Sequence, residues 1–530
     1  MRKHPVVFIA FEEFDNLGVG YLAAILENAG FNSILIDPRK GENEILSILR
    51  RVRPVLVGFS VIFQYHITEF QRLIKLLRSG GIKCHFTAGG HYASLRFEEL
   101  FNIIPWLDSV VRFEGEYTLL ELTRYLNSGR DWKQLTGIAY KNGENSISNP
   151  LRPPEIDLDW YPFPIRSSIR RYAFDKNYTS IIAGRGCLHN CSFCNMNKFF
   201  RHPGWPLKRK RRPAMIIREM EMLYHEKNCS IFLFEDDDFP ISKAEEDRWI
   251  SEFCDGLRSL GLGDKILWKI NCRPDEIDER KFKMMKDQGL FLIFCGIEDG
   301  TDIGLKTLNK NLTVSRIISG INTLKKLKIG IDYGFILFQP GTTFTTLYKN
   351  IDFLKNICGD GYSPVSFLRM MPYYETKVEE ELKKQGRLKG EPGFRTYDFI
   401  EVTLDLYYNF IMECFSEWLR SPDGLVNISK WARNNLLVFS RYFETGSEFT
   451  KMSQHVTQII SESNMYLLDA MSEIAVIFET GKEIQLKKRL LNLKKLIYSK
   501  HEHYKDEINI TMSALMLLSC EYNPLLLNYL

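Results

Sequence analysis

Three absences limit the class of this 530-residue protein. No run of about 18 apolar residues occurs, and the first apolar stretch is too short for a signal peptide, so no membrane span or secretion is expected. Neither sign of charge dominates, because the sequence contains 70 Lys and Arg and 66 Asp and Glu. The 11 Cys are odd in number and scattered, unlike a secreted disulfide framework. We therefore expect a cytoplasmic globular protein.

Short apolar runs alternate with helical patterns over residues 1–136. The runs are VVFIA, SILID, VLVGFSV, CHFTAGG and SVVRFEG. This alternation predicts a doubly wound parallel sheet of flavodoxin-like order, whose ligands bind at the carboxyl ends of the strands. A hairpin with a turn at Asn142-Gly143 and a proline-rich stretch follow, so residues 137–175 are predicted to be a linker.

A second alternation of strands and helices begins near residue 176. The strand candidates are 179–184, 230–236, 266–272, 290–298, 329–338 and 364–371. Six strands are two short of a full α/β barrel, so residues 176–394 are predicted to form an open, partial (β/α)6 barrel. Helical periodicity alone continues beyond that point, which predicts an all-α domain over residues 395–530.

Three cysteines, Cys187, Cys191 and Cys194, form the pattern C-x3-C-x2-C after the first strand of the predicted barrel. Barrels of this kind place their active sites in the loops at that face. Four thiolates would saturate a [4Fe–4S] cluster, so three leave one iron open for a substrate or cofactor. The alternative is a structural zinc site with His189 or His202 as fourth ligand, although paired C-x2-C knuckles are absent.

This pattern, with Phe193 as the aromatic residue before the last cysteine, resembles the signature of radical S-adenosylmethionine (SAM) enzymes over roughly residues 176–375. The resemblance implies that Cys187, Cys191 and Cys194 bind a [4Fe–4S] cluster whose open iron binds SAM. Reduction would then cleave SAM to methionine and a 5′-deoxyadenosyl radical, which takes a hydrogen atom from the substrate.

Segments at the ends of later strands resemble further motifs of that family. The residues implied to contact SAM or substrate are Asp236, Asp237, Arg273, Glu298 and Gln339. The two aspartates would accept hydrogen bonds from the SAM ammonium group, unless they form a solvated turn. Glu298 is implied to act in catalysis as a ligand for SAM or substrate. The alternative is a buried carboxylate paired with Arg273 or Lys310.

The N-terminal half resembles the cobalamin (B12)-binding domain that precedes the radical SAM core in one subgroup. The matching segments are LGVGYLAAILENAG, VGFSVIF, TAGGHYAS and VVRFEGE. The implied cobalamin contacts are Ser60, Gly89, Gly90 and His91, although His91 is equally well interpreted as a capping or core histidine. The cobalt-binding D-x-H-x-x-G motif is missing, but many radical members of the subgroup lack it and still bind cobalamin.

The densest charge run is Lys208–Arg212. We interpret it as a solvated loop, with a nucleic-acid patch or a docking site for an acidic partner as alternatives. The predicted partners are a small-molecule or peptide substrate and a flavodoxin- or ferredoxin-type electron donor, with no nucleic acid and no membrane. The near-neutral net charge of +4 supports both exclusions.

Together these features predict a cobalamin-dependent radical SAM methyltransferase that acts on an unactivated carbon in natural product biosynthesis. Its predicted cofactors are a [4Fe–4S] cluster, SAM and cobalamin. The alternative is a radical SAM dehydratase, epimerase or cyclase whose B12-type domain does not bind cobalamin. A non-catalytic cobalamin or redox sensor is a third class, against which the intact cysteine triad argues.

Overall fold

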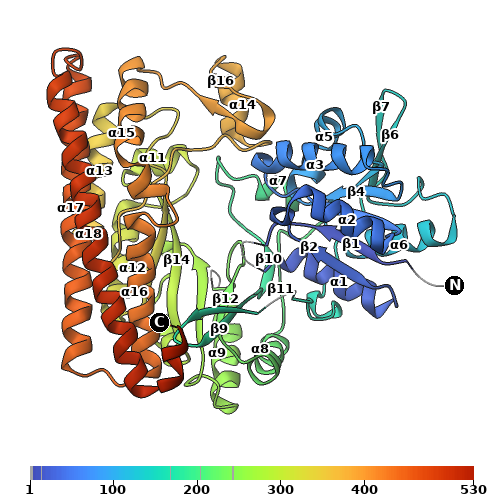
Figure 1. Ribbon diagram of the computed structural model, residues 1–530, viewed down its shortest axis with the longest axis horizontal. Coiled ribbons are helices and arrows are strands. Elements are labelled where there is room, and N and C mark those ends of the chain that lie inside the picture. The colour runs from blue at the N-terminus through green and yellow to red at the C-terminus, as the bar shows by residue number, and fades with distance from the viewer. Residues whose placement is uncertain (1–3, 13–14, 167–168, 203, 242–243, 530) are drawn as a thin grey trace. The chain divides into compact units, whose positions relative to one another are not determined.

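The computed structural model describes residues 4–12, 15–166, 169–202, 204–241 and 244–529 (Figure 1). The chain divides into two compact units. Unit 1 comprises Met1–Ile169, Ser180–Glu219 and Pro372–Thr396, and unit 2 comprises Arg170–Thr179, Met220–Met371 and Tyr397–Leu530. Each unit therefore combines segments that are far apart in the sequence.

Unit 1 contains a seven-stranded sheet with the order β2-β1-β3-β4-β5-β6-β7. The strands are β1 (Val6–Ile9), β2 (Ser33–Ile36), β3 (Leu56–Ser60), β4 (His85–Gly89), β5 (Ser109–Val111), β6 (Ile138–Asn142) and β7 (Asn145–Ser148). The first five are parallel and confirm the predicted flavodoxin-like order. The last two form the predicted hairpin, which pairs antiparallel with β5.

Helices cover both faces of this sheet, as a parallel sheet requires. They are α1 (Leu17–Asn28), α2 (Glu42–Val52), α3 (Ile67–Ser79), α4 (His91–Leu95), α5 (Phe97–Ile103) and α6 (Glu116–Ser128). One apolar cluster joins the sheet to α2, α3 and α5 and includes Phe59 and Phe70. The other joins it to α1 and α6 and includes Phe8 and Leu122. The predicted doubly wound architecture is confirmed.

The remaining elements of unit 1 come from the middle of the chain. They are β10 (Gly184–Gly186), α7 (Met196–Phe200), β11 (Lys208–Lys210), α14 (Lys377–Lys384) and β16 (Leu388–Lys389). The helix α8 (Pro213–Lys227) begins in unit 1 and continues in unit 2 after Glu219. The cysteine pattern and the N-terminal sheet are therefore parts of one compact unit.

The sheet of unit 2 has six strands in the order β15-β14-β13-β12-β9-β8. They are β8 (Arg170–Ala173), β9 (Lys176–Ile181), β12 (Cys229–Phe234), β13 (Leu267–Cys272), β14 (Leu290–Glu298) and β15 (Gly330–Phe335). The last four pair in parallel and alternate with α9 (Ala244–Ser259), α10 (Glu279–Asp287), α11 (Asp302–Thr307), α12 (Val314–Lys326) and α13 (Phe344–Cys358). This arrangement confirms the predicted open barrel.

One strand differs from the prediction. The candidate strand 364–371 makes only an isolated parallel bridge, between Phe338 and Arg369. The amide of Val365 donates instead to the side chain of Asn464, at 2.8 Å, so a side chain replaces a strand partner. The sixth strand of the sheet is β8, which forms an antiparallel hairpin with β9.

The C-terminal part of unit 2 is helical, as predicted (Figure 1). It consists of α15 (Val402–Arg420), α16 (Leu425–Tyr442), α17 (Ser447–Glu479) and α18 (Lys487–Tyr522). The hydroxyl of Tyr442 donates to the carbonyls of Ser230 and Lys265, so α16 lies at the N-terminal ends of the strands, away from their carboxyl ends. In the described part of the chain, no helix has the length and apolar character that crossing a bilayer requires.

Candidate functional site

The cysteine loop (residues 187–195) lies in unit 1 between β10 and α7. The strands β10 and β11 pair antiparallel and close its base. Cys187, Cys191 and Cys194 are half-buried, as is Phe193. Gly186 has φ +93°, and a Cβ there would lie 2.1 Å from the Leu207 carbonyl oxygen, so only glycine fits the turn into the loop. The donor set of three accessible thiols fits a cluster with one open iron.

Buried ion pairs join the base of the cysteine loop to the segment between β5 and α6. Arg185, two residues before Cys187, binds Glu116 at 2.7 Å and Glu114 at 3.3 Å. Arg209 of β11 also binds Glu114, and the exposed fractions of these two side chains are 4% and 9%. Removing one member of a buried pair leaves an uncompensated charge, so these pairs hold the loop firmly to the segment RFEGE.

These contacts correct the interpretation of Lys208–Arg212 as a solvated loop. Arg211 is buried and binds Glu219 at 2.6 Å and Asp159 at 3.4 Å. Arg212 is exposed, yet it also binds Asp159, at 2.9 Å. Glu219 follows the run closely in the sequence, but Asp159 comes from a segment about 50 residues earlier, so the run by itself carried no sign of it.

The predicted cobalamin contacts Ser60, Gly89, Gly90 and His91 come together at the C-terminal edge of the unit 1 sheet. Ser60 and Gly89 are register partners at the ends of β3 and β4. Gly90 has φ +103°, and a Cβ there would lie 2.9 Å from the carbonyl oxygen of Val61. Glycine at position 90 thus lets the chain pass close to Val61, and small residues occupy little space at this edge, which is where doubly wound sheets bind ligands. The edge therefore fits a large cofactor.

His91 connects this sheet edge to the segment that follows the cysteine loop. Its ring centroid lies 4.2 Å from that of Phe199 in α7, and Phe199 also contacts Phe113. Burial lowers the pKa of His91 to about 4, so its ring is neutral at neutral pH. The histidine is thus an aromatic packing residue as well as a candidate cofactor contact.

Residues 372–396 belong to unit 1, where they contact both candidate regions. The amide of Val378 donates to the carbonyl of Ser192 in the cysteine loop, at 3.3 Å. The hydroxyl of Tyr374 donates to the carbonyl of Ile62, just after β3, at 3.0 Å. Arg96, at the junction of α4 and α5, binds Glu379 at 2.8 Å. Sequence patterns carried no signal for this packing.

In unit 2, the predicted acidic segment follows β12. Asp236 is buried and Asp237 is exposed, and the side-chain amide of Asn271 donates to the Asp236 carbonyl at 2.9 Å. The segment is therefore only partly a solvated turn. Asn271 is the second-to-last residue of β13, so this hydrogen bond holds the acidic segment at the carboxyl end of that strand.

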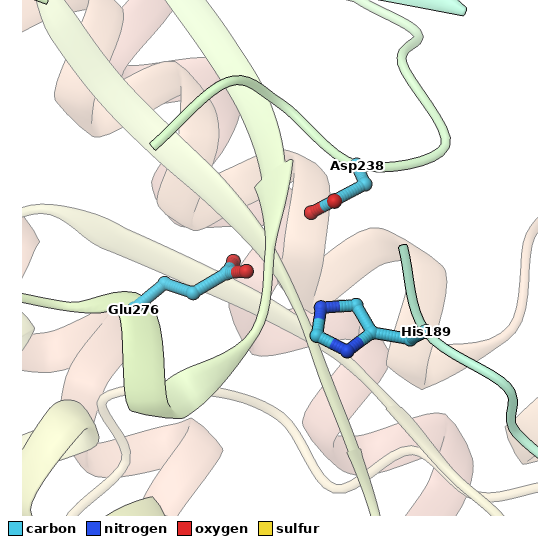
Figure 2. A group of neighbouring side chains, drawn as sticks. All are labelled: His189, Asp238 and Glu276. Atoms are coloured by element: carbon cyan, nitrogen blue, oxygen red, sulfur yellow. The ribbon is translucent and has the colours of Figure 1, made fainter. Parts of the chain in front are cut away.

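Asp238 and Glu276 face each other at the same end of the sheet (Figure 2). Both are buried, and each offers a carboxylate oxygen within 4.8 Å of the other. His189, which Figure 2 also labels, is a residue of unit 1. Sequence reasoning missed Glu276. The only feature of the sequence that could have indicated Glu276 is its position three residues after Arg273. In the structure, the Arg273 amide donates to the Glu276 carboxylate at 2.8 Å.

Arg273 has one guanidinium nitrogen available for a ligand. The side chain is 7% exposed and donates to Asp275 at 3.0 Å and to the carbonyl of Lys310 at 2.7 Å. Among the described residues, its Nη1 is buried and has no hydrogen-bond partner. An unpaired buried donor is unfavourable, and a carboxylate would satisfy it. Arg273 thus fits a carboxylate-bearing cofactor such as SAM.

Glu298 ends β14 in a strained conformation. Its φ is +70°, and the pairing of β14 with β15 shifts register between Gly296 and Glu298, as in a β-bulge. Lys310 donates to its carboxylate at 3.1 Å. Of the two partners expected for a buried Glu298, the structure therefore has Lys310. Strain of this kind is concentrated at functional sites, because it fixes a side chain in one direction.

Gln339 is held by a carboxylate after β14. Its side-chain amide donates to Asp299 at 2.6 Å, and both residues are buried. Burial raises the pKa of Asp299, while hydrogen bonds from Thr301, Asn350 and Gln339 act in the opposite direction. The geometry gives Gln339 a role in orienting Asp299, next to Glu298.

Comparison with known families matches two parts of the chain. The model of the B12 binding domain matches residues 4–123, and the model of the radical SAM superfamily matches residues 181–354. The second match begins before the cysteine loop and ends within α13. Both matches agree with the resemblances inferred from the motifs.

Individual proteins with related sequences include two enzymes. The anaerobic magnesium-protoporphyrin IX monomethyl ester cyclase of Cereibacter sphaeroides is 27% identical over 62% of this chain and 54% of its own length. The chain thus matches about half of that relative. The cytidylyl-2-hydroxyethylphosphonate methyltransferase of Streptomyces wedmorensis is 23% identical over 71% of this chain and 79% of its own length.

A solved structure extends the similarity to almost the whole fold. It is that of the cobalamin-dependent S-adenosylmethionine radical enzyme OxsB with aqua-cobalamin and S-adenosylmethionine bound. The TM-score is 0.66 at 18% identity, over 94% of this chain and 84% of that chain. At this identity the comparison supports the fold, including the helical C-terminal part.

Proposed function

This chain belongs to the radical SAM superfamily, in the subgroup with an N-terminal cobalamin-binding domain, and we propose that it methylates an unactivated carbon of a small molecule. The observation that carries the proposal is that the cysteine loop and the sheet edge of the B12-binding domain belong to one compact unit. The contact between His91 and Phe199 and the ion pair between Arg209 and Glu114 join them. A radical source and a methyl carrier would thus share a scaffold.

The proposed roles follow from the chemistry of each side chain. Cys187, Cys191 and Cys194 hold the [4Fe–4S] cluster through their thiolates. Ser60, Gly89, Gly90 and His91 form the cobalamin edge. When bound, the reduced cluster with SAM supplies a radical that removes a hydrogen atom, and cobalamin supplies the methyl group.

Side chains of unit 2 are proposed to bind and orient SAM or the substrate. The free Nη1 of Arg273 binds a carboxylate, and the carboxylates of Asp238 and Glu276 accept hydrogen bonds from a cationic group. Glu298, directed by its strained backbone and by Lys310, binds a ligand hydroxyl or ammonium group.

The proposal is tested on protein purified anaerobically from cobalamin-fed cells. The expected preparation contains a cluster and a stoichiometric corrinoid, and labelled SAM transfers its methyl group to the bound corrinoid. Alanine at Cys187, Cys191 or Cys194 should abolish the cluster absorbance while the corrinoid is retained. Retention of the cluster in all three variants would contradict the assignment of the ligands.

The similarity to the Cereibacter sphaeroides cyclase is the reason to test a second candidate. In this case the chain is a radical SAM dehydratase, epimerase or cyclase, and its B12-type domain is a scaffold. An intact cluster and SAM cleavage without bound corrinoid would support the second candidate and reject methylation.

We further propose a cytoplasmic location, a substrate from natural product biosynthesis and a flavodoxin- or ferredoxin-type electron donor. Reduction of the cluster by a purified flavodoxin system, compared with dithionite, tests the proposed donor. Failure of such low-potential proteins to support SAM cleavage would reject it.

A further inference from the structure

The turn between α17 and α18 and the first part of α18 form a basic surface that the proposed function does not use. Residues 482–500, here called the basic tip, contain seven Lys and Arg and one acidic residue, Glu483. The whole chain has a net charge of only +4, so its excess of positive charge is concentrated in this short segment. Such a surface favours anionic partners.

Three exposed apolar side chains lie along the basic tip at intervals of seven residues. Ile484, Leu491 and Tyr498 are 84%, 51% and 64% exposed. Leu491 and Tyr498 lie seven residues apart on one face of α18, and Ile484 lies in the turn before it; these three form the apolar stripe. Leu490 and Ile497, each one position before a stripe residue of the helix, are buried. The stripe therefore points away from the core of unit 2.

Lysines border the apolar stripe on both sides. Its first two residues are each followed by lysines three and four positions later, namely Lys487, Lys488, Lys494 and Lys495. Lys494 binds Glu413 of α15, whereas the other three are exposed. The long lysine side chains can cover apolar surface with their stems while the ammonium groups reach an anionic layer.

A shallow hollow of about 470 Å³ lies on the same surface. Lys488, Asn492 and Leu496 are among the residues that line it, so cationic, amide and apolar groups meet there. This combination suits a phosphate headgroup with an attached apolar chain, because charge-assisted hydrogen bonds are the strong ones.

The basic tip lies at the end of unit 2 that holds the candidate site residues. Glu479, the last residue of α17, accepts a hydrogen bond from the hydroxyl of Tyr348 in α13, at 3.0 Å. The helix α13 begins shortly after Gln339, at the carboxyl end of β15. Figure 1 shows the connection between α17 and α18 at the top of the view, near α13 and α15.

The second half of α18 has exposed apolar residues without a basic border. Ile510 is 66% exposed, and its neighbours include Asp506 and Glu507 but no lysine or arginine within four positions. The turn and α18 thus offer two exposed isoleucine-bearing regions, one basic and one not. The second provides a matched control for the first.

We propose that the basic tip binds the surface of an anionic lipid bilayer, with the apolar stripe at the boundary between headgroups and acyl chains. A bilayer fits better than an acidic protein because the most exposed apolar residue, Ile484, lies at the turn itself, where it can enter a planar interface. The proposal is independent of the reaction. It revises the expectation of no membrane partner, which rested on the total charge.

The first test measures sedimentation of the full-length, cofactor-loaded protein with two kinds of vesicle. One contains phosphatidylcholine alone, and the other contains in addition about 30 mol% phosphatidylglycerol. The protein should bind the anionic vesicles only. Replacing Lys487, Lys488 and Lys495 by Gln should weaken binding roughly 100-fold, or about fivefold for each lysine.

The control variant removes three exposed lysines of unit 2 outside the basic tip, Lys265, Lys306 and Lys349. It has the same net charge and should bind as the parent does. Equal weakening in both triple variants, or no binding of the parent to either vesicle, would overturn the proposal. Binding to immobilised polyglutamate without binding to vesicles would assign the surface to an acidic protein, which also overturns it.

A second pair of variants tests the apolar stripe. Ile484→Ser should weaken vesicle binding several-fold, whereas Ile510→Ser in the second half of α18 should leave it unchanged. Equal behaviour of the two serine variants would contradict insertion of the stripe.

Discussion

Lys208–Arg212 and the basic tip are the two basic segments of this protein, and their surroundings are opposite. In the first, five consecutive basic residues cross β11, and Arg209 and Arg211 are buried against Glu114 and Glu219. In the basic tip, leucines interrupt the lysines, yet most of the lysines are exposed. Alternate residues of a strand face opposite sides, whereas helical residues three, four and seven positions apart share one face, and that face is exposed for most lysines of the basic tip. The density of charge in a sequence therefore does not predict its exposure.

The largest expected loss of stability comes from replacing a buried arginine of Lys208–Arg212. Arg209→Gln leaves the buried Glu114 paired with Arg185 alone, so the free energy of unfolding should fall by up to about 5 kcal/mol. Urea denaturation measures it. Arg212→Gln, at an exposed position in the same run, should leave the midpoint almost unchanged. If both variants lose the same stability, the distinction between alternating residues is wrong.

Acidification should destabilise the packing around His91 in unit 1. Burial lowers the pKa of His91 from 6.5 to about 4. Between these two values the histidine is protonated in the unfolded state and neutral in the folded state. The free energy of unfolding should therefore fall between pH 6.5 and 4, by about 3 kcal/mol for this group. His91→Gln should flatten the pH profile in part, since His85 shifts in the same direction; an unchanged profile would contradict the assignment.

A third variant asks whether a buried ion pair at the candidate site is only structural. Glu298→Gln removes the charge that Lys310 binds and, if Glu298 contacts SAM, should raise the dissociation constant of SAM about tenfold or more. Equilibrium dialysis with the cluster-loaded protein measures this constant. If Glu298→Gln lowers the stability but leaves the dissociation constant of SAM unchanged, Glu298 has a structural role, as Arg209 does.

The smallest effect on stability is expected at the basic tip. The triple replacement of Lys487, Lys488 and Lys495 by Gln should change the free energy of unfolding by no more than about 0.5 kcal/mol, since exposed positions tolerate substitution. Raising the salt concentration should release the parent protein from anionic vesicles, and it should hardly affect the stability difference of Arg209→Gln. A large loss of stability in the triple variant would show that these lysines make internal contacts.

Much of the fold was predictable because the signals are local. Apolar runs and their alternation with helices predicted the flavodoxin-like order, the hairpin after β5, the open barrel and the helical C-terminal part, all of which the structure confirms. The candidate strand 364–371 was wrong because Asn464, from a distant helix, takes the amide of Val365. The domain boundaries stay predictions.

The sequence by itself determined the chemistry that the protein can carry. The spacing of Cys187, Cys191 and Cys194 within one loop is enough to indicate a cluster, because three ligands on a short segment need no distant partner. The small residues Ser60, Gly89 and Gly90 at the ends of β3 and β4 likewise indicated a ligand-binding sheet edge. Such motifs can be recognised in the sequence because their residues are close together along the chain.

Only the tertiary structure decided which charges are paired and which are free. It placed Glu276 beside Asp238, bound Glu298 to Lys310, and buried Arg209 against Glu114. The basic tip, which comprises the turn between α17 and α18 and the start of α18, stays largely exposed. The physical reason is that an ion pair, a buried donor or an exposed surface depends on which distant segments pack together, and residue order alone does not specify that packing.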